Sequence, residues 1–79
     1  MNMVKIGKYR HYKGKYYKVI GIAHHSETLE EMVVYQALYT SSEFGRNALW
    51  VRPKKIFEGS VIFKGKKVSR FKPVLQSKA

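Results

Sequence analysis

The chain contains no cysteine, which excludes disulfide bonds and thiolate metal sites. Acidic residues are scarce: five Asp and Glu stand against 16 Lys and Arg, for a formal net charge of +11. No apolar run approaches the length of a membrane span, and the first residues lack the apolar stretch of a signal peptide. We therefore expect a cytoplasmic protein that does not bind membranes and is stabilised by an apolar core alone.

Positive charge and aromatic rings are abundant instead. The 79 residues include six Tyr, four Phe and one Trp, and 44% of the chain is apolar, which is too hydrophobic for a disordered protein. This length allows one domain. We predict a single domain over residues 1–79, with a core spanning about residues 6–74 and a flexible basic C-terminal tail.

Short β-type runs separated by turns recur along the chain, and helical periodicity is nearly absent. This pattern predicts a small all-β barrel of about five antiparallel strands. Lys13-Gly14 and Lys64-Gly65 are predicted to be the turns of two lysine-rich hairpins. Pro53 is expected to end a strand, and the segment "KKIFEG" after it to form one short helical turn that packs Ile56 and Phe57 against an open end of the barrel.

The two runs on either side of "HHSETLEE", residues 24–31, alternate in a way that predicts which side chains face the core. The side chains expected inside are Tyr17, Val19, Ala23, Val33, Tyr35 and Ala37. Pairing of the two strands about Thr28 would place Gly21 opposite Tyr35. The outer faces remain apolar, so either the barrel or a partner subunit covers them, and the sequence leaves the oligomeric state open.

The segment "HHSETLEE" holds the residue types of an active site. Ser26 or Thr28 beside His25 and Glu27 could form a catalytic triad, but neighbours within one turn seldom meet that geometry. Adjacent residues on a strand point to opposite faces, so two neighbouring histidines do not bind one metal ion easily. We favour a turn in which Ser26 and Thr28 bond nearby backbone N–H groups. We predict no catalytic residue, no metal and no cofactor.

Glu27 is expected to act as a structural anion in that turn. Its candidate partners are Arg10, Arg52 and Arg70.

The stretch "KYRHYKGKYYK" interleaves cations with tyrosines. Small β-barrels that bind single strands combine cations for phosphates with aromatic faces for bases. We therefore favour nucleic acid, DNA or RNA, as the partner, bound mainly through its phosphates. The residues predicted to bind it are Lys8, Arg10, Tyr12, Lys13, Lys15, Tyr16, Lys18, Trp50, Arg52, Lys54, Lys55, Lys64, Lys66 and Lys67. The opposing interpretation is that the lysines only keep the protein soluble.

A protein partner is the alternative. If Trp50 lay at the surface near Tyr9, Tyr12 or Tyr39, it would build an aromatic groove for an extended peptide, with Arg52 at the rim.

Four blocks, "GKYRHYKGKYY", "AHHSETLEEMVVYQALY", "LWVRPKKIF" and "GKKVSRFKPV", resemble an uncharacterised family of short bacterial proteins. That family's pattern runs GxYRHYKGxxY, HSET, VVYxxLY, WVRP and PRF, and the resemblance covers about residues 6–74. It implies an SH3-like barrel and no assigned activity. Ser69 stands where the pattern has proline. The resemblance also singles out a polar cluster with a structural or ligand-binding role: His11, His25, Ser26, Glu27, Thr28 and Arg70.

Overall fold

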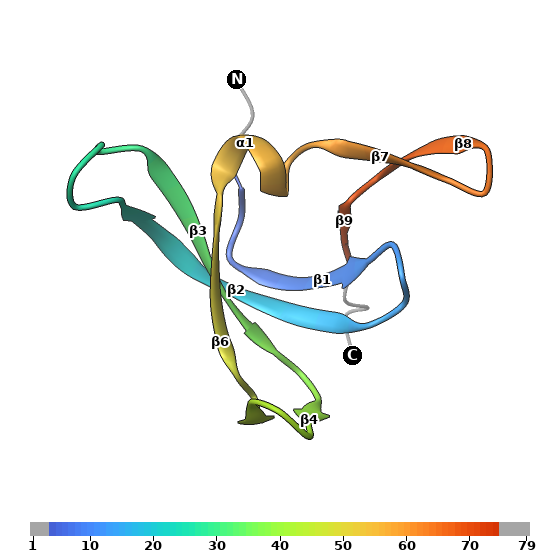
Figure 1. Ribbon diagram of the computed structural model, residues 1–79, viewed down its shortest axis with the longest axis horizontal. Coiled ribbons are helices and arrows are strands. Elements are labelled where there is room, and N and C mark those ends of the chain that lie inside the picture. Colours follow the sequence, from blue (N-terminus) through green and yellow to red (C-terminus); the bar gives the residue numbers. More distant parts are fainter. Residues whose placement is uncertain (1–3, 75–79) are drawn as a thin grey trace, which may run out of the picture.

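The computed structural model describes residues 4–74, which form a small, mostly β domain with one short helix (Figure 1). Five strands make an antiparallel sheet in the order β6-β3-β2-β1-β9, and β4–β5 and β7–β8 each form a separate two-stranded sheet. The elements in chain order are β1 (Gly7–His11), β2 (Tyr16–His24), β3 (Glu31–Ala37), β4 (Thr40–Ser41), β5 (Gly45–Arg46), β6 (Leu49–Pro53), α1 (Lys54–Phe57), β7 (Ser60–Phe63), β8 (Lys66–Ser69) and β9 (Phe71–Pro73).

The predicted fold class is confirmed: the domain is all-β and antiparallel, with a helical turn directly after Pro53. Within residues 4–74 no ladder joins β6 to β9, so these two strands are the edges of the five-stranded sheet and its hydrogen bonds do not close into a barrel. No helix of this part of the chain is long and apolar enough to cross a membrane. The predicted flexible tail lies outside the described residues.

The core lies on the inner face of the five-stranded sheet and under α1. Its buried side chains are Tyr9, Val19, Val33, Tyr35, Ala37, Phe57 and Phe71. Phe57 reaches in from the helix and stacks on Phe71, with ring centroids 4.1 Å apart and an interplanar angle of 8°. The prediction that Phe57 packs on the sheet is confirmed. Ile56 is 47% exposed, because one helical turn cannot aim two consecutive side chains at the same surface.

A β-bulge in β2 corrects the predicted strand faces. Val19 pairs with Tyr35 but Gly21 pairs with Val34, so Ile20 is an extra residue without a partner. Gly21 therefore does not lie opposite Tyr35. The bulge reverses the in–out alternation beyond it, since side chains alternate with a period of two. Ala23, expected inside, is exposed for this reason.

The segment between β2 and β3 is a turn, as predicted. The Leu29 N–H donates to the His25 carbonyl at 2.8 Å, and the Thr28 hydroxyl accepts the Glu30 N–H at 3.2 Å. The expected role of Ser26 is filled by His25, whose Nδ1 accepts the N–H groups of Glu27 and Thr28 at 3.1 and 3.3 Å.

Candidate nucleic-acid interface

Two lysine-rich hairpins, β1–β2 and β7–β8, lie on the same side of the molecule (Figure 1). The β7–β8 turn places Lys64 and Gly65 at φ values of 52° and 79°, the left-handed backbone that such two-residue hairpin turns require. The hairpin reaches the turn between β1 and β2, where the rings of Tyr12 and Phe63 touch edge to face with centroids 5.3 Å apart. Both predicted turns are confirmed, and the fold brings their cations to a common surface.

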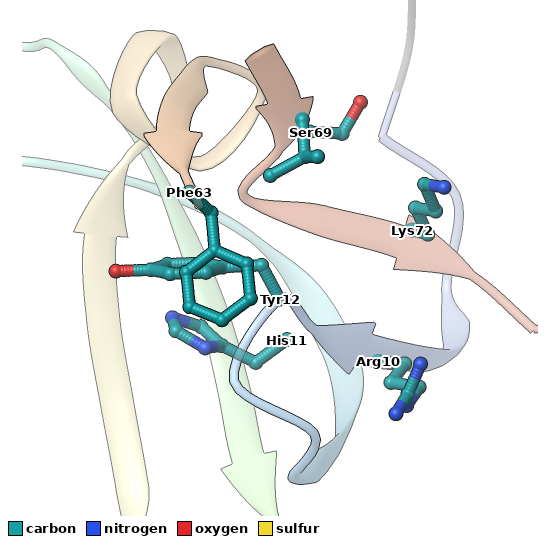
Figure 2. A pocket seen from close by; sticks show the side chains of 7 residues that line it. Arg10, His11, Tyr12, Phe63, Ser69 and Lys72 are labelled. Carbon is teal, nitrogen blue, oxygen red and sulfur yellow. The ribbon is translucent and has the colours of Figure 1, made fainter. Parts of the chain in front are cut away.

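A pocket of about 210 Å³ opens between these hairpins. Figure 2 shows its aromatic rings on one side and two cationic side chains on the other. Its lining residues are Arg10, His11, Tyr12, Phe63, Val68, Ser69 and Lys72. Pockets for drug-sized ligands usually measure about 300–1,000 Å³, so this one suits a single planar ring system.

The aromatic side of the pocket is a packed group of three rings with cations above them. His11 and Tyr12 lie at 4.5 Å with a 31° tilt, and Phe63 meets Tyr12 at 69°. The Lys13 Nζ lies 5.9 Å from the Tyr12 centroid and the Lys64 Nζ lies 5.4 Å from that of Phe63. Cation–π contacts of this kind contribute about 0.5–1 kcal/mol at exposed sites, and they hold the ammonium groups beside the rings.

The cationic side of the pocket continues as a basic strip along the outer face of the sheet. We define the strip as Lys8, Arg10, Lys18 and Lys72. Lys8 pairs directly across the strands with Lys18, and Arg10 with Lys72. Like charges placed directly opposite each other destabilise a sheet. The strip therefore concentrates positive charge at a cost to stability.

No carboxylate neutralises this surface within residues 4–74. The ion pairs of residues 4–74 join Lys54 to Glu31 at 3.7 Å and to Glu58 at 3.9 Å, next to α1 and away from this surface. Glu27 makes none of the ion pairs of residues 4–74, so its predicted pairing with Arg10, Arg52 or Arg70 is wrong. Arg10 and Arg70 lie near the opposite end of β2, and Arg52 donates to the Tyr35 hydroxyl instead. No group of three His, Cys, Asp or Glu side chains in this range is arranged to hold a metal ion.

The structure gathers part of the predicted nucleic-acid set. Arg10 and Tyr12 line the pocket, Lys13 and Lys64 stand over its rings, and Lys66 pairs with Phe63 in the β7–β8 hairpin. The other members that lie on the two hairpins or the outer face are Lys8, Lys15, Tyr16, Lys18 and Lys67. Tyr16 lies beneath the Lys8 ammonium, 4.7 Å from it.

Four predicted members lie elsewhere. Lys54 and Lys55 belong to α1, and Arg52 turns to the inner face, where its Nε donates to the Tyr35 hydroxyl at 3.2 Å. Trp50 packs against the core and meets Phe44 edge to face at 5.0 Å. Its ring contacts within residues 4–74 include none of the tyrosines predicted to share a groove with it, so the peptide groove stays a prediction.

The polar cluster implied by the resemblance divides into two groups. His11 and Arg70 lie together, since the Tyr12 N–H next to His11 donates to the Arg70 carbonyl at 3.0 Å. The remaining members, His25, Ser26, Glu27 and Thr28, are exposed in the β2–β3 turn at the opposite end of β2. The six residues therefore do not form one site.

Sequence reasoning missed four pocket residues: Phe63, Val68, Ser69 and Lys72. Lys72 belongs to the strip because β9 pairs with β1. It was missed because β9, Phe71–Pro73, is only three residues long and ends in a proline, so the sequence did not predict a strand there. The repeated aromatic-Lys-Gly-Lys pattern at Tyr12 and Phe63 was the available clue, because it marks both hairpin ends with a ring next to a turn.

These features define a small antiparallel β domain with a basic, ring-lined pocket between two hairpins. A family model described as a protein of unknown function, DUF1653, matches residues 7–73, and the chain belongs to this family. It is similar to the crystal structure of a DUF1653 protein from Bordetella bronchiseptica, with 32% identity, a TM-score of 0.81, and coverage of 96% of this chain and 94% of the other. The predicted resemblance to an uncharacterised family is confirmed. A comparison with curated proteins found no match.

Proposed function

We propose that this domain is a non-catalytic module that binds single-stranded nucleic acid, DNA or RNA. The observation that carries the proposal is the basic strip of Lys8, Arg10, Lys18 and Lys72 leading into a pocket with an aromatic side. Phosphates would lie on the strip, where the paired cations gain a counter-charge that residues 4–74 do not supply. One unstacked base would enter the pocket and pack against Tyr12 and Phe63.

Single strands are favoured over duplexes by the pocket. A base must leave its stack to reach a ring, and this is easier when it has no paired partner. Stacking on an aromatic ring tolerates every base, so the proposal implies weak sequence preference and strong dependence on salt.

Charge reversal on the β7–β8 hairpin tests the proposal. The variant Lys64→Glu/Lys66→Glu is expected to weaken binding of a labelled single-stranded oligonucleotide at least about tenfold at low salt, because it places carboxylates beside the pocket. The matched control, Arg46→Glu/Lys55→Glu, changes the net charge equally at exposed positions outside the pocket lining. Equal losses in the two variants, with both folded by circular dichroism, would show that only total charge matters and would refute the pocket.

A further inference from the structure

Arg52, on the inner face of the sheet, and Arg70, in the bend between β8 and β9, have no carboxylate partner within residues 4–74. Arg52 projects from β6, with its Nε bonded to the neutral Tyr35 hydroxyl and its Cζ 5.7 Å from the Phe71 centroid. Arg70 precedes Phe71 in the chain. All ion pairs of this part of the protein are made by Lys54. Two half-buried arginines thus lack a counter-ion within the described residues.

His11 lies beside Phe71, the ring that Arg52 also contacts. Its ring meets Phe71 at 4.9 Å and Tyr17 at 6.3 Å, both edge to face. The Arg52 Cζ lies 5.7 Å from the centroid of the same Phe71 ring. Burial lowers the pKa of His11, and the charges of Arg52, Arg70 and Lys13 lower it further. Arg52 and His11 therefore contact the same ring, and Arg70 is the residue directly before that ring in the chain.

Two buried side-chain donors belong to residues close in sequence to Phe71 and to Arg52. The Nε of Arg70 and the Nε1 of Trp50 are both buried without a hydrogen-bond partner. Trp50 stands two residues before Arg52 on β6, so the two side chains share the inner face. Buried polar groups in folded proteins nearly always have a partner. Both atoms are donors only, so each pairs with an acceptor, and an anionic acceptor would also offset the charge of the two arginines.

We infer that this inner face is a binding site for a small oxyanion, a phosphate or a carboxylate, held by Arg52 and Arg70 with His11 at its edge. Guanidinium groups bind both anions through paired N–H donors. The site is distinct from the proposed nucleic-acid surface: it uses neither hairpin tip nor the basic strip, and it shares with the pocket only His11. Its ligand is a small anion rather than a strand.

The test is a titration of the ¹⁵N-labelled full chain with inorganic phosphate, and separately with acetate, at an ionic strength kept constant with potassium chloride. The side-chain N–H resonances of Arg52, Arg70 and Trp50 are expected to shift and saturate with at least one anion. A response to phosphate alone identifies a phosphate site, and a matching response to acetate identifies a carboxylate site. Shifts that stay linear, or that potassium chloride reproduces, overturn the inference.

Substitutions of the two arginines test whether they bind the anion. Arg52→Gln and Arg70→Gln are each expected to lower the affinity at least about tenfold, the usual effect of losing a hydrogen bond to a charged group. Arg70→Lys, which keeps the charge but lacks the Nε donor, replaces Arg70→Gln if that variant does not fold. The Lys64→Glu/Lys66→Glu variant should keep the response, so the anion site and the proposed strand binding can fail separately. Unchanged affinity in the arginine variants refutes the assignment.

Discussion

His11 belongs to both proposed sites. Its ring lines the pocket, and the charges of Arg52 and Arg70 act on its pKa. Its pKa is lowered first by burial and then by the charges of Arg52, Arg70 and Lys13. The rings of Tyr12, Tyr17 and Phe71 enclose it and offer no carboxylate to stabilise an imidazolium. The native state therefore disfavours a proton on this ring.

This lowered pKa predicts a pH dependence of stability. Below the ordinary value of 6.5 the unfolded chain protonates this histidine while the native state resists, so the free energy of unfolding falls as pH drops through 6.5. The loss ends below the lowered native pKa. We expect His11→Asn to lack this part of the pH dependence. Urea denaturation of both proteins from about pH 8 to about pH 4.5 checks it, and parallel stability curves would contradict it.

The stacked pair of Phe57 and Phe71 joins the helix to the sheet. Truncation of a buried phenylalanine usually costs about 3–5 kcal/mol, through lost burial and the cavity that remains. We expect Phe71→Ala to lower the free energy of unfolding by this amount, measured by urea denaturation. Ile62→Ala is the control, because Ile62 is 73% exposed and surface changes stay within about 0.5 kcal/mol. A similar cost for both would mean that Phe71 is not a core residue.

At the scale of elements, the β7–β8 hairpin contributes Phe63, Val68 and Ser69 to the pocket, and its turn has a strained backbone. Lys64 adopts a φ of 52°, a left-handed conformation that Asn tolerates better than Lys. Asn-Gly is also the favoured pair for hairpin turns with two left-handed residues.

We therefore expect Lys64→Asn to stabilise the hairpin by about 0.5–1 kcal/mol, which corresponds to amide exchange slowed roughly two- to fivefold. Hydrogen exchange at the amides of Phe63 and Lys66, which pair across the strands, reports it. Val33 in the central strand serves as the reference for global opening. Faster exchange at the hairpin amides alone would show that the lysine side chain, not the backbone, stabilises the turn.

Local pattern predicted most of these elements but not their register. The turns at Lys13-Gly14 and Lys64-Gly65 and the helix after Pro53 were predictable, because glycine and proline fix the backbone locally. The bulge at Ile20 was not, since nothing in an alternating run marks which residue lacks a partner. Because the bulge was not predicted, Ala23 was assigned to the wrong face of the sheet.

The candidate site was predictable in kind and incomplete in detail. Charge and interleaved tyrosines pointed to the β1–β2 hairpin, and Tyr12 does line the pocket. Lys72 was missed because its position depends on the pairing of β9 with β1, a contact between the two ends of the chain. The placement of Arg52 on the inner face likewise follows from the pairing of β6 with β3, which residue types alone do not specify.

At the scale of the whole molecule, charge and fold act together. The formal charge of +11 attracts any polyanion, but the fold places like charges opposite each other on one face beside a pocket. The carboxylates that form ion pairs do so beside α1, away from this pocket. A solubility role would require no such segregation, which is why we favour a bound strand.

The most direct measurement is a binding titration of the full chain against labelled single-stranded and double-stranded DNA and RNA of one length, at two salt concentrations. We expect tighter binding of a single strand than of its duplex, with an affinity that falls steeply as salt rises, since each phosphate contact releases counter-ions. An abasic strand of equal charge should bind more weakly, because stacking contributes about 1–3 kcal/mol per base. Equal binding of strand, duplex and abasic strand, or no binding at low salt, would contradict it.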